Sequence, residues 1–247
     1  MINHRRTPKN TRAVIPRRVT RTFQAMFHTL VRQPFQAQRA HLFMRLVAPK
    51  AGATVLDLGG GPGHFFARVR NHFHARCVVA DIASDFTHSV QRHGFEFALL
   101  KEDGPLPFKN QEFDIVFCNS VIEHVTLPKE LCSTSMSEQE WQSRAWDRQM
   151  EFADEIRRVG TAYFVQTPHK EFPFETHVLL PFAHRLNHNQ MLTLIRFTNR
   201  YWLRRWKYVD WNLLGIKEMR ALFPEAQIHV ERILGMPKSI IAYVKQT

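Results

Sequence analysis

Apolar residues follow two different periods along this chain, and the change between them divides the sequence. Over 23–31 and again over 35–47 they recur three and four positions apart, which predicts two N-terminal helices. From Thr54 onward, short apolar runs alternate with amphipathic stretches, and turn residues separate them. This alternation predicts a mostly parallel sheet that is covered by helices on both faces.

The individual elements of this α/β region can be read from the same pattern. Ser137 and Glu140 form a predicted capping box at the start of the longest helix, and Gly160 is expected to end it. Two late apolar runs, 227–233 and 239–244, predict a closing antiparallel strand pair. The other predicted strands are 55–58, 77–80, 95–100, 113–118 and 162–166, and the predicted helices between them are 64–72, 85–93 and 137–159.

Charge is distributed unevenly along the 247 residues, whose formal net charge is +12. Residues 1–56 carry eleven Lys or Arg and no acid, whereas the remaining residues hold 23 basic and 22 acidic side chains. The basic character therefore belongs to the leading segment. Four interpretations stay open for it: a solvated tail, contact with nucleic acid, contact with an anionic membrane, or a mitochondrial transit peptide in a eukaryotic source.

Composition excludes several classes of protein. The content of apolar residues (44%) and charged residues (23%) is that of an ordinary globular protein and not of a disordered chain. The three cysteines lie far apart, so neither a zinc ribbon nor a redox pair is indicated. No apolar run is long enough to span a membrane or to form a secretory signal, and a cytoplasmic location is expected.

A glycine-rich turn follows the first predicted strand. Four of the ten glycines lie at positions 59–63, between strand 55–58 and the next helix. Glycine is needed where the backbone must approach a ligand closely, and this geometry cradles a phosphate or a cofactor. The dinucleotide fingerprint Gly-x-Gly-x-x-Gly would place its third glycine at His64, so the spacing departs from it.

An acid stands at the place where nucleotide cofactors favour one. Asp81 ends the second predicted strand, twenty residues after Gly61, and a carboxylate there can accept both hydroxyl groups of a ribose. The turn and the acid together indicate a nucleoside-containing cofactor.

Several motifs in this order and spacing resemble those of the class I S-adenosylmethionine-dependent methyltransferases. Asp57-Leu58-Gly59-Gly60-Gly61-Pro62-Gly63 is similar to their first motif, and 113–125 resembles the fourth strand and following helix of the methyltransferase type 11 branch. The resemblance covers about 54–167 well. It implies a Rossmann-like three-layer sandwich whose mostly parallel seven-stranded sheet ends in an antiparallel C-terminal strand pair.

The resemblance also implies S-adenosyl-L-methionine as the cofactor and names the residues that hold it. Asp81 matches the ribose-binding acid, Ile82 the residue that packs on the adenine, and Asp103-Gly104 the segment whose acid meets the adenine amino group. The implied cofactor-binding residues are Asp57, Gly59, Gly61, Gly63, Asp81, Ile82, Asp103, Gly104 and Asn119.

Catalytic residues are harder to name, because methyl transfer needs a general base only if the acceptor must lose a proton. Candidates follow the fourth and fifth predicted strands, since open α/β sheets bind ligands beyond the carboxyl ends of their strands. They are Glu123 and His124 after the fourth strand and His169, Glu175 and His177 after the fifth, of which His124, Glu175 and His177 are the leading candidates. A structural interpretation stays open for each, with His124 packing a helix and Glu175 pairing with His177. The spacing of these residues with His169 matches no zinc signature, so no metal is predicted.

The expected organisation is a basic arm (1–22) and a methyltransferase domain (23–247). Within the domain we expect N-terminal helices (23–50), a cofactor-binding core (54–167), an insertion that covers the substrate (168–222) and closing strands (223–247). Arginines alternate with aromatic residues over 196–211 of the insertion, which indicates an amphipathic lid helix.

The leading hypothesis is a methyltransferase that acts on a small-molecule or lipid-like acceptor by in-line displacement. Residues that follow the fourth strand do not resemble the motifs of DNA-amine or RNA-cytosine enzymes, which favours a small molecule by elimination. Two alternatives stay open: an RNA methyltransferase that is recruited by the basic arm, and an inactive cofactor-binding interaction module. The sequence makes no prediction of the oligomeric state.

Overall fold

The computed structural model describes residues 33–69, 76–175, 180–201 and 208–246. The chain divides into two compact units, residues 1–42 and 43–247, and α2 (Gln33–Val47) runs across the boundary between them. The predicted helix over 23–31 and the basic arm over 1–22 lie outside the described residues.

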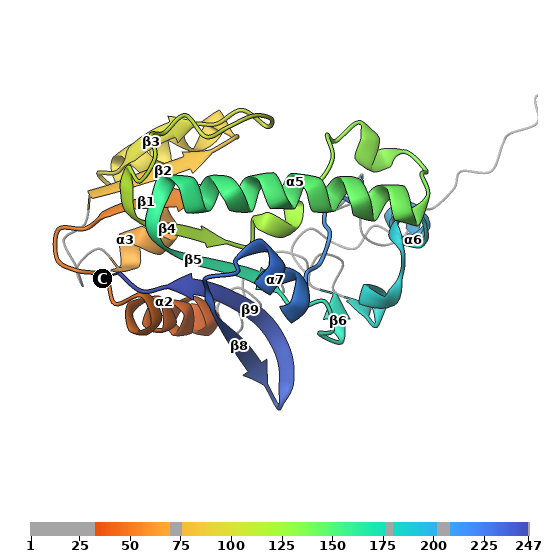
Figure 1. Ribbon diagram of the computed structural model, residues 1–247. Helices are drawn as coiled ribbons and strands as arrows, with labels where there is room; N and C mark the ends of the chain where they lie inside the picture. Colours follow the sequence, from red (N-terminus) through yellow and green to blue (C-terminus); the bar gives the residue numbers. More distant parts are fainter. Residues whose placement is uncertain (1–32, 70–75, 176–179, 202–207, 247) are drawn as a thin grey trace, which may run out of the picture. The chain divides into compact units, whose positions relative to one another are not determined.

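A seven-stranded sheet forms the centre of the second unit (Figure 1). Its order is β3-β2-β1-β4-β5-β9-β8, in which the first five strands are parallel and the last two are antiparallel. The predicted fold class is therefore confirmed. The strands are β1 (Thr54–Leu58), β2 (Arg76–Asp81), β3 (Glu96–Leu99), β4 (Phe113–Asn119), β5 (Gly160–Pro168), β8 (Gln227–Ile233) and β9 (Met236–Val244).

Helices connect these strands in the predicted order. The α-helices are α3 (His64–Val69), α4 (Thr87–Arg92), α5 (Glu138–Val159), α6 (His188–Tyr201) and α7 (Ile216–Leu222). Short 3₁₀ helices are η3 (Ser84–Phe86), η4 (Ile122–His124), η5 (Leu131–Ser133) and η6 (Ala183–Arg185).

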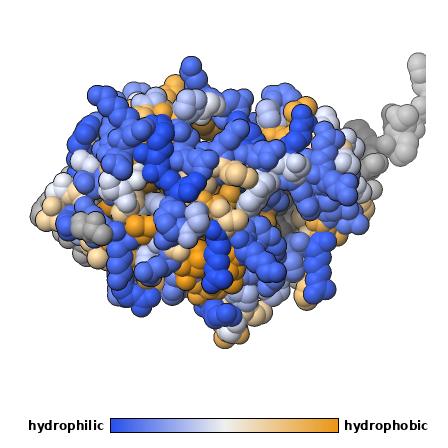
Figure 2. All heavy atoms as spheres, in the orientation of Figure 1, coloured by the Kyte–Doolittle hydropathy of each residue, from blue (hydrophilic) through white to orange (hydrophobic). Residues whose placement is uncertain are grey.

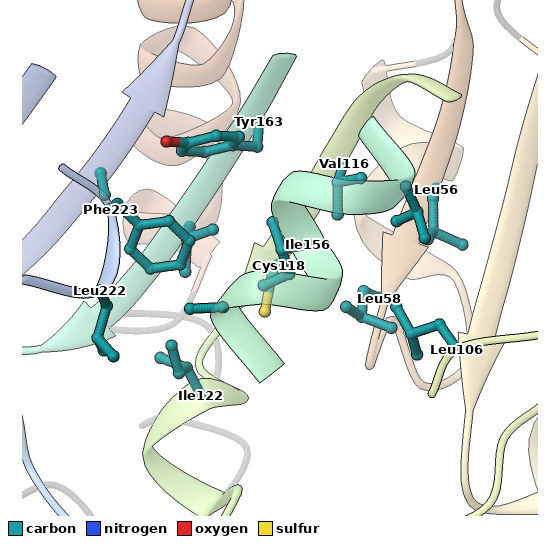
Figure 3. Packing of buried hydrophobic residues seen from close by; sticks show 14 of the residues in the cluster. Leu56, Leu58, Leu106, Val116, Cys118, Ile122, Ile156, Tyr163, Leu222 and Phe223 are labelled. Atoms are coloured by element: carbon teal, nitrogen blue, oxygen red, sulfur yellow. The ribbon is translucent and has the colours of Figure 1, made fainter. Parts of the chain in front are cut away.

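The central strands are buried on both faces, as their nearly continuous apolar runs predict. On one face, Val116 and Cys118 of β4 pack beneath Ile156 of α5, together with residues of α7 (Figure 3). On the other face the ring of Phe117 stacks on Phe65 of α3. Both faces thus contribute to the core, and α5 runs along the length of the sheet (Figure 1).

Both ends of α5 lie where the sequence predicted them. Ser137 caps the helix as expected, since its hydroxyl accepts a hydrogen bond from the backbone N–H of Glu140 at 3.1 Å. Gly160 follows the last helical residue, Val159, and ends the helix as expected, with an extended φ of −118°. Packing also favours glycine here, because a Cβ at this position would lie 2.5 Å from Cγ2 of Val116.

The insertion after β5 has less regular structure than the core. It contains α6 and a two-stranded sheet of β6 (Phe174–Glu175) and β7 (Leu180–Pro181), which the sequence did not predict. The predicted lid helix is confirmed only in part, because residues 208–211 are not helical. Within the described part of the chain, no helix is both long and apolar enough to cross a bilayer.

Candidate functional site

The carboxyl ends of β1, β2 and β4 meet at one edge of the sheet. Leu58 at the end of β1 pairs with Ala80 of β2 and with Cys118 of β4. The chain therefore leaves these strands at the same level, and it does so at the three polar or glycine positions Gly59, Asp81 and Asn119. A crevice at such an edge is the usual ligand site of an open α/β sheet.

The turn after β1, residues 59–63, forms a sharp elbow that only glycine permits at two of its positions. Gly59 has a φ of +71°, and a Cβ on it would lie 2.4 Å from Cγ2 of Val121. A Cβ on Gly60 would lie 2.3 Å from Oδ2 of Asp57. Gly61 faces open space, with only the ring of Phe86 at 3.8 Å, so the elbow leaves room for a ligand against its backbone.

Asp81 is directed at this elbow, as the sequence predicted. Its Oδ2 accepts a hydrogen bond from the backbone N–H of Gly61 at 3.0 Å, and its Oδ1 accepts one from Ala83 at 3.0 Å. A carboxylate oxygen accepts more than one hydrogen bond, so both oxygens can also receive ligand hydroxyl groups. The carboxylate thus joins the end of β2 to the cradle.

Asp57 is the most strongly perturbed carboxyl group at this edge. It is buried, and its Oδ2 has no hydrogen-bond partner among the described residues. Burial, and secondly repulsion from Asp81, raise the pKa of Asp57 to about 8. A cationic or hydrogen-bond-donating ligand group would compensate for this cost, so Asp57 is a strong candidate for ligand contact.

Asn119 is a second buried acceptor beside the elbow. Its Oδ1 is also without a hydrogen-bond partner in the described part of the chain. Buried polar atoms are normally satisfied, so two such oxygens at one edge indicate a missing donor. The ammonium group and ribose hydroxyl groups of S-adenosylmethionine are donors of this kind, and the residues present therefore fit the cofactor that the sequence implies.

The remaining predicted cofactor residues lie nearby in the fold but differ in their contacts. Ile82 is 47% exposed after β2 and so offers an apolar surface. Gly104 has a φ of +98° and open space around it. Asp103 forms an ion pair with Arg148 of α5, so its carboxylate is already engaged on the side of that helix.

The candidate base His124 lies in η4, directly after β4. Its Nδ1 is 3.2 Å from Oδ1 of Asp210, and both side chains are partly buried. A carboxylate on one ring nitrogen fixes the tautomer and leaves the other nitrogen as the basic one. This pair has the arrangement of an oriented general base.

A second group of contacts joins η4 to the segment over 208–214. Glu123 is fully buried and its Oε2 accepts a hydrogen bond from Oγ1 of Thr167 at 3.0 Å, at the end of β5. Its backbone carbonyl accepts one from Asn212 at 2.8 Å. The side-chain amide of Gln149 donates to the carbonyls of Ile122 and Asn212 at 3.0 and 3.1 Å. The end of the insertion is thus held against the end of β4.

The other predicted catalytic candidates give a different picture. His169 is buried, and its Nδ1 accepts a hydrogen bond from the backbone N–H of Glu171 at 3.0 Å. Burial lowers the pKa of His169, and its bond to the backbone of its own segment is a structural contact. Glu175 is in β6, but its side chain and all of His177 lie outside the described residues. Among the described residues, no cluster of His, Cys, Asp and Glu is arranged to hold a metal ion.

Sequence analysis missed Asp210, which the structure brings to His124. A signal for it was present, because Asp210 is the one acid between Glu175 and Glu218 in the sequence. An isolated acid in a basic segment needs a reason, and the contact with His124 gives one. Gln149 and Asn212 gave no comparable signal.

A cavity of about 920 Å³ lies beside this connection. It is lined by the first half of α5, by residues after β5 and by 209–214, with tryptophan and charged side chains together on its wall. Lining residues include Trp141, Trp146, Trp211, Glu138, Glu171 and Lys170. Figure 2 shows that hydrophilic side chains cover most of the face on which α5 lies, and that hydrophobic ones gather in smaller groups between them.

Comparisons with known proteins point to one family. Residues 56–136 match a family model described as a methyltransferase domain. A search of curated proteins finds no significant match.

Among solved structures, the PH0226 protein from Pyrococcus horikoshii OT3 is 15% identical with a TM-score of 0.52, over 90% of this chain and 97% of that one. DhpI, solved in complex with SAH, is 16% identical with a TM-score of 0.51, over 90% and 89%. A chain from the complex between the Trm112 methyltransferase activator of Haloferax volcanii and a methyltransferase is 13% identical with a TM-score of 0.51, over 91% and 93%.

At these identities the solved structures establish the fold, and the family model establishes the kind of domain that carries it. The matched region begins in β1 and ends before α5, so it contains the elbow, Asp81 and η4. Residues 56–136 therefore match the methyltransferase domain family that the sequence motifs resemble, within a chain that has the fold of these solved structures.

Proposed function

We propose that this enzyme methylates a small-molecule or lipid-like acceptor that binds beyond the carboxyl ends of β4 and β5. The observation that carries the proposal is the pairing of His124, from the core, with Asp210, from the segment that ends the insertion. The cavity lined by the neighbours of Asp210 supports it, because its volume of about 920 Å³ lies in the range of small-molecule sites.

On the cofactor side, the residues of this chain would bind S-adenosylmethionine and orient it. When bound, S-adenosylmethionine supplies a methyl group activated by a positively charged sulfur. Asp81 would hold the ribose hydroxyl groups and Ile82 would pack against the adenine. Asp57 and Asn119 would accept hydrogen bonds from the amino acid end, which their buried oxygens favour. Alignment of donor and acceptor supplies much of the rate in such displacements.

On the acceptor side, His124 is the residue that would take a proton. Asp210 holds the ring through Nδ1, so the proton would be accepted at Nε2. Glu123 has a different role in this proposal. It is buried and accepts a hydrogen bond from Thr167 at the end of β5, and this contact would hold η4 in position. Residues 168–222 form the acceptor-binding insertion in this proposal, and Asp210 of this insertion contacts the base.

Calorimetry with S-adenosylhomocysteine tests the cofactor half of the proposal. Asp81→Ala is expected to weaken binding about 10- to 100-fold, since hydrogen bonds to a charged group are lost. Asp85→Asn is the matched control, because Asp85 is an exposed acid four residues further on, in η3. Equal affinities of the parent protein and Asp81→Ala would contradict the assignment of this carboxylate.

Methyl transfer from labelled donor into fractions of a host extract tests the acceptor half. Label in a small-molecule or lipid fraction is expected, with turnover lowered about 100-fold in His124→Gln and with unchanged binding of S-adenosylhomocysteine. Asp210→Asn should reduce turnover less, since it leaves the base in place. Label that enters only RNA, and that is lost when residues 1–22 are deleted, would favour the RNA alternative.

A further inference from the structure

A second acid-free segment lies inside the insertion. Residues 176–209 contain six Lys or Arg and no Asp or Glu. Together with residues 1–56, this segment holds 17 of the 34 basic side chains of the protein. Positive charge is therefore concentrated in 176–209 as well as in the leading segment, while the acids of the insertion, Glu171, Glu175, Asp210 and Glu218, lie outside this segment. An anionic partner is the expected complement of 176–209.

Exposed aromatic rings gather at the β6–β7 hairpin in the same insertion. Phe174 is 51% exposed and pairs with Pro181 across the two strands. Phe182, which follows Pro181 directly, is 59% exposed. The ring of Phe172 lies 6.1 Å from that of Phe174. Arg185 lies over the ring of Phe182 at 5.6 Å from its centroid. We call Phe172, Phe174, Phe182, His184 and Arg185 the hairpin patch.

Phe182 is held in this patch at a steric cost. Its φ of +60° is in the left-handed region, where a bulky side chain is rarely found. Its backbone N–H donates to the carbonyl of Pro173 at 2.6 Å, which fixes the conformation. The backbone is thus strained at a residue whose large apolar ring is exposed to solvent, and such strain is typical of functional positions.

From these observations we infer that the hairpin patch binds the surface of a membrane that carries anionic lipid. Phenylalanine rings insert at the level of the lipid headgroups, while arginine on the same surface contacts the phosphates. The inference concerns where the enzyme resides during its reaction, and it does not depend on which acceptor is methylated.

The chemistry of the patch favours lipid over single-stranded nucleic acid. Both partners would use its aromatic rings and positive charge. Recognition of nucleic acid also draws on side chains that reach phosphates and bases, and in the patch only His184 and Arg185 can donate a hydrogen bond. Three phenylalanine rings without polar atoms are better matched to the acyl region below the headgroups.

Co-sedimentation of the full-length protein with vesicles tests the inference. Vesicles of phosphatidylcholine with one-third phosphatidylglycerol are compared with vesicles of phosphatidylcholine alone. We expect preferential binding to the first, weakened by salt, and a roughly tenfold or greater loss for Phe174→Ser combined with Phe182→Ser. Arg185→Glu is expected to weaken binding to the anionic vesicles by about 30-fold, since the charge reverses at the surface.

Matched controls separate the patch from the rest of the basic protein. Leu99→Ser removes a side chain that is 57% exposed on the edge strand β3, and Arg144→Glu reverses an exposed charge on α5. Both controls should bind vesicles as the parent protein does. Circular dichroism and binding of S-adenosylhomocysteine establish that each patch variant is folded.

Three outcomes would overturn the inference. The first is unchanged vesicle binding by folded patch variants, which would assign any binding to the leading basic segment. The second is equal binding to neutral and anionic vesicles. The third is binding to single-stranded polynucleotide that competes with the vesicles and is lost in the same patch variants, which would identify the patch as a nucleic acid site.

Discussion

The proposed cofactor edge (57–63, Asp81 and Asn119) and the proposed acceptor side (122–124 and 208–214) are built in different ways. At the cofactor edge, residues 57–63 are held by backbone geometry, and glycines at positions 59 and 60 are required because a Cβ would collide with neighbours. On the acceptor side, contacts between side chains far apart in sequence do the same work, such as His124 with Asp210. One region is specified locally and the other by tertiary contacts.

This difference has a consequence for how each region can change. An elbow fixed by steric exclusion tolerates few substitutions, because a side chain would collide with Val121 or Asp57, or would fill the room beside Gly61. A surface held by individual hydrogen bonds can exchange them one at a time, each at a modest free-energy cost. A common cofactor with variable acceptors is the expected result of such a division.

The largest effect is expected at the elbow. Gly60→Val places a branched side chain where even a Cβ would lie 2.3 Å from Oδ2 of Asp57. The free energy of unfolding should fall by about 3 kcal/mol, and binding of S-adenosylhomocysteine should be lost. Denaturant titration and calorimetry measure the two effects.

Gly52→Ala is the control for this substitution. Gly52 also has a positive φ, of +80°, but no atom lies within 4 Å of the Cβ position. It should cost about 1 kcal/mol through backbone strain and leave cofactor binding unchanged. Equal losses in both variants would mean that steric exclusion does not explain the elbow.

A smaller effect is expected from the buried carboxyl group of Asp57. Its pKa rises from 3.8 to about 8 on folding. Between these values the folded state holds a proton that the unfolded state has lost, so stability decreases as the pH rises and levels off above about pH 8. The loss should be on the order of 2 kcal/mol between pH 6 and pH 8. Urea unfolding across this range measures it.

Asp57→Asn should flatten this pH dependence, since the titrating group is gone. Asp85→Asn serves as its control, because it removes an exposed acid and should keep the slope of the parent protein. A slope that survives in Asp57→Asn would assign the titration to another group. The burial of Asp57 would then affect its pKa less than expected, and the cofactor edge would differ less from the acceptor side.

Sequence patterns predicted which residues lie together at the proposed cofactor edge, because the determinants of their positions are local. Apolar runs located β1, β2 and β4, and parallel pairing necessarily brings their carboxyl ends to one edge. Gly59 and Asp81 were therefore placed together from their positions after those strands. The same argument placed His124 at this edge, because it follows β4 directly.

The acceptor side could not be predicted in the same way. Asp210 lies 86 residues from His124, and no periodic pattern encodes that contact. The two-residue strands β6 and β7 are too short to give an alternation signal. Gly160 was correctly predicted to end α5, but its close packing against Val116 was not predicted, because steric contact across strands is not visible in a linear sequence.

Substitution of Gln149 is expected to lower the free energy of unfolding by an intermediate amount, and it tests the acceptor side. Its buried amide bonds the carbonyls of Ile122 and Asn212, and Gln149→Leu would leave both without this donor. We expect a loss of about 1.5 kcal/mol in the free energy of unfolding. Hydrogen exchange at the amide of Asn212 should become faster, while the amide of Gly59 in the elbow keeps its protection.

Gln142→Leu is the matched control on the same helix, since the amide of the exposed Gln142 bonds only the half-buried Glu138 among the contacts of the described chain. It should change the free energy of unfolding by less than about 0.5 kcal/mol. If Gln149→Leu also exposed the amide of Gly59, the two regions would form one cooperative unit, and the distinction between them would fail.

The smallest effect is expected at the ion pair that borders the cavity. Lys170, after β5, pairs with Glu218 of α7, and their side chains are 42% and 33% exposed. Arg76 and Glu96 form a comparable pair on the strands of the cofactor half, 56% and 57% exposed. Glu218→Gln and Glu96→Gln should each cost less than about 1 kcal/mol, since solvent screens both pairs.

Double-mutant cycles on the two ion pairs would test whether electrostatic interactions contribute differently to the two regions. Similar coupling energies, both reduced by salt, are expected if surface electrostatics contribute equally to the two regions. A coupling at Lys170 and Glu218 several times that at Arg76 and Glu96 would show that the acceptor side is also held electrostatically. In that case exchange of acceptor contacts would be costly, and the division between a fixed cofactor edge and an adaptable acceptor side would need another physical basis.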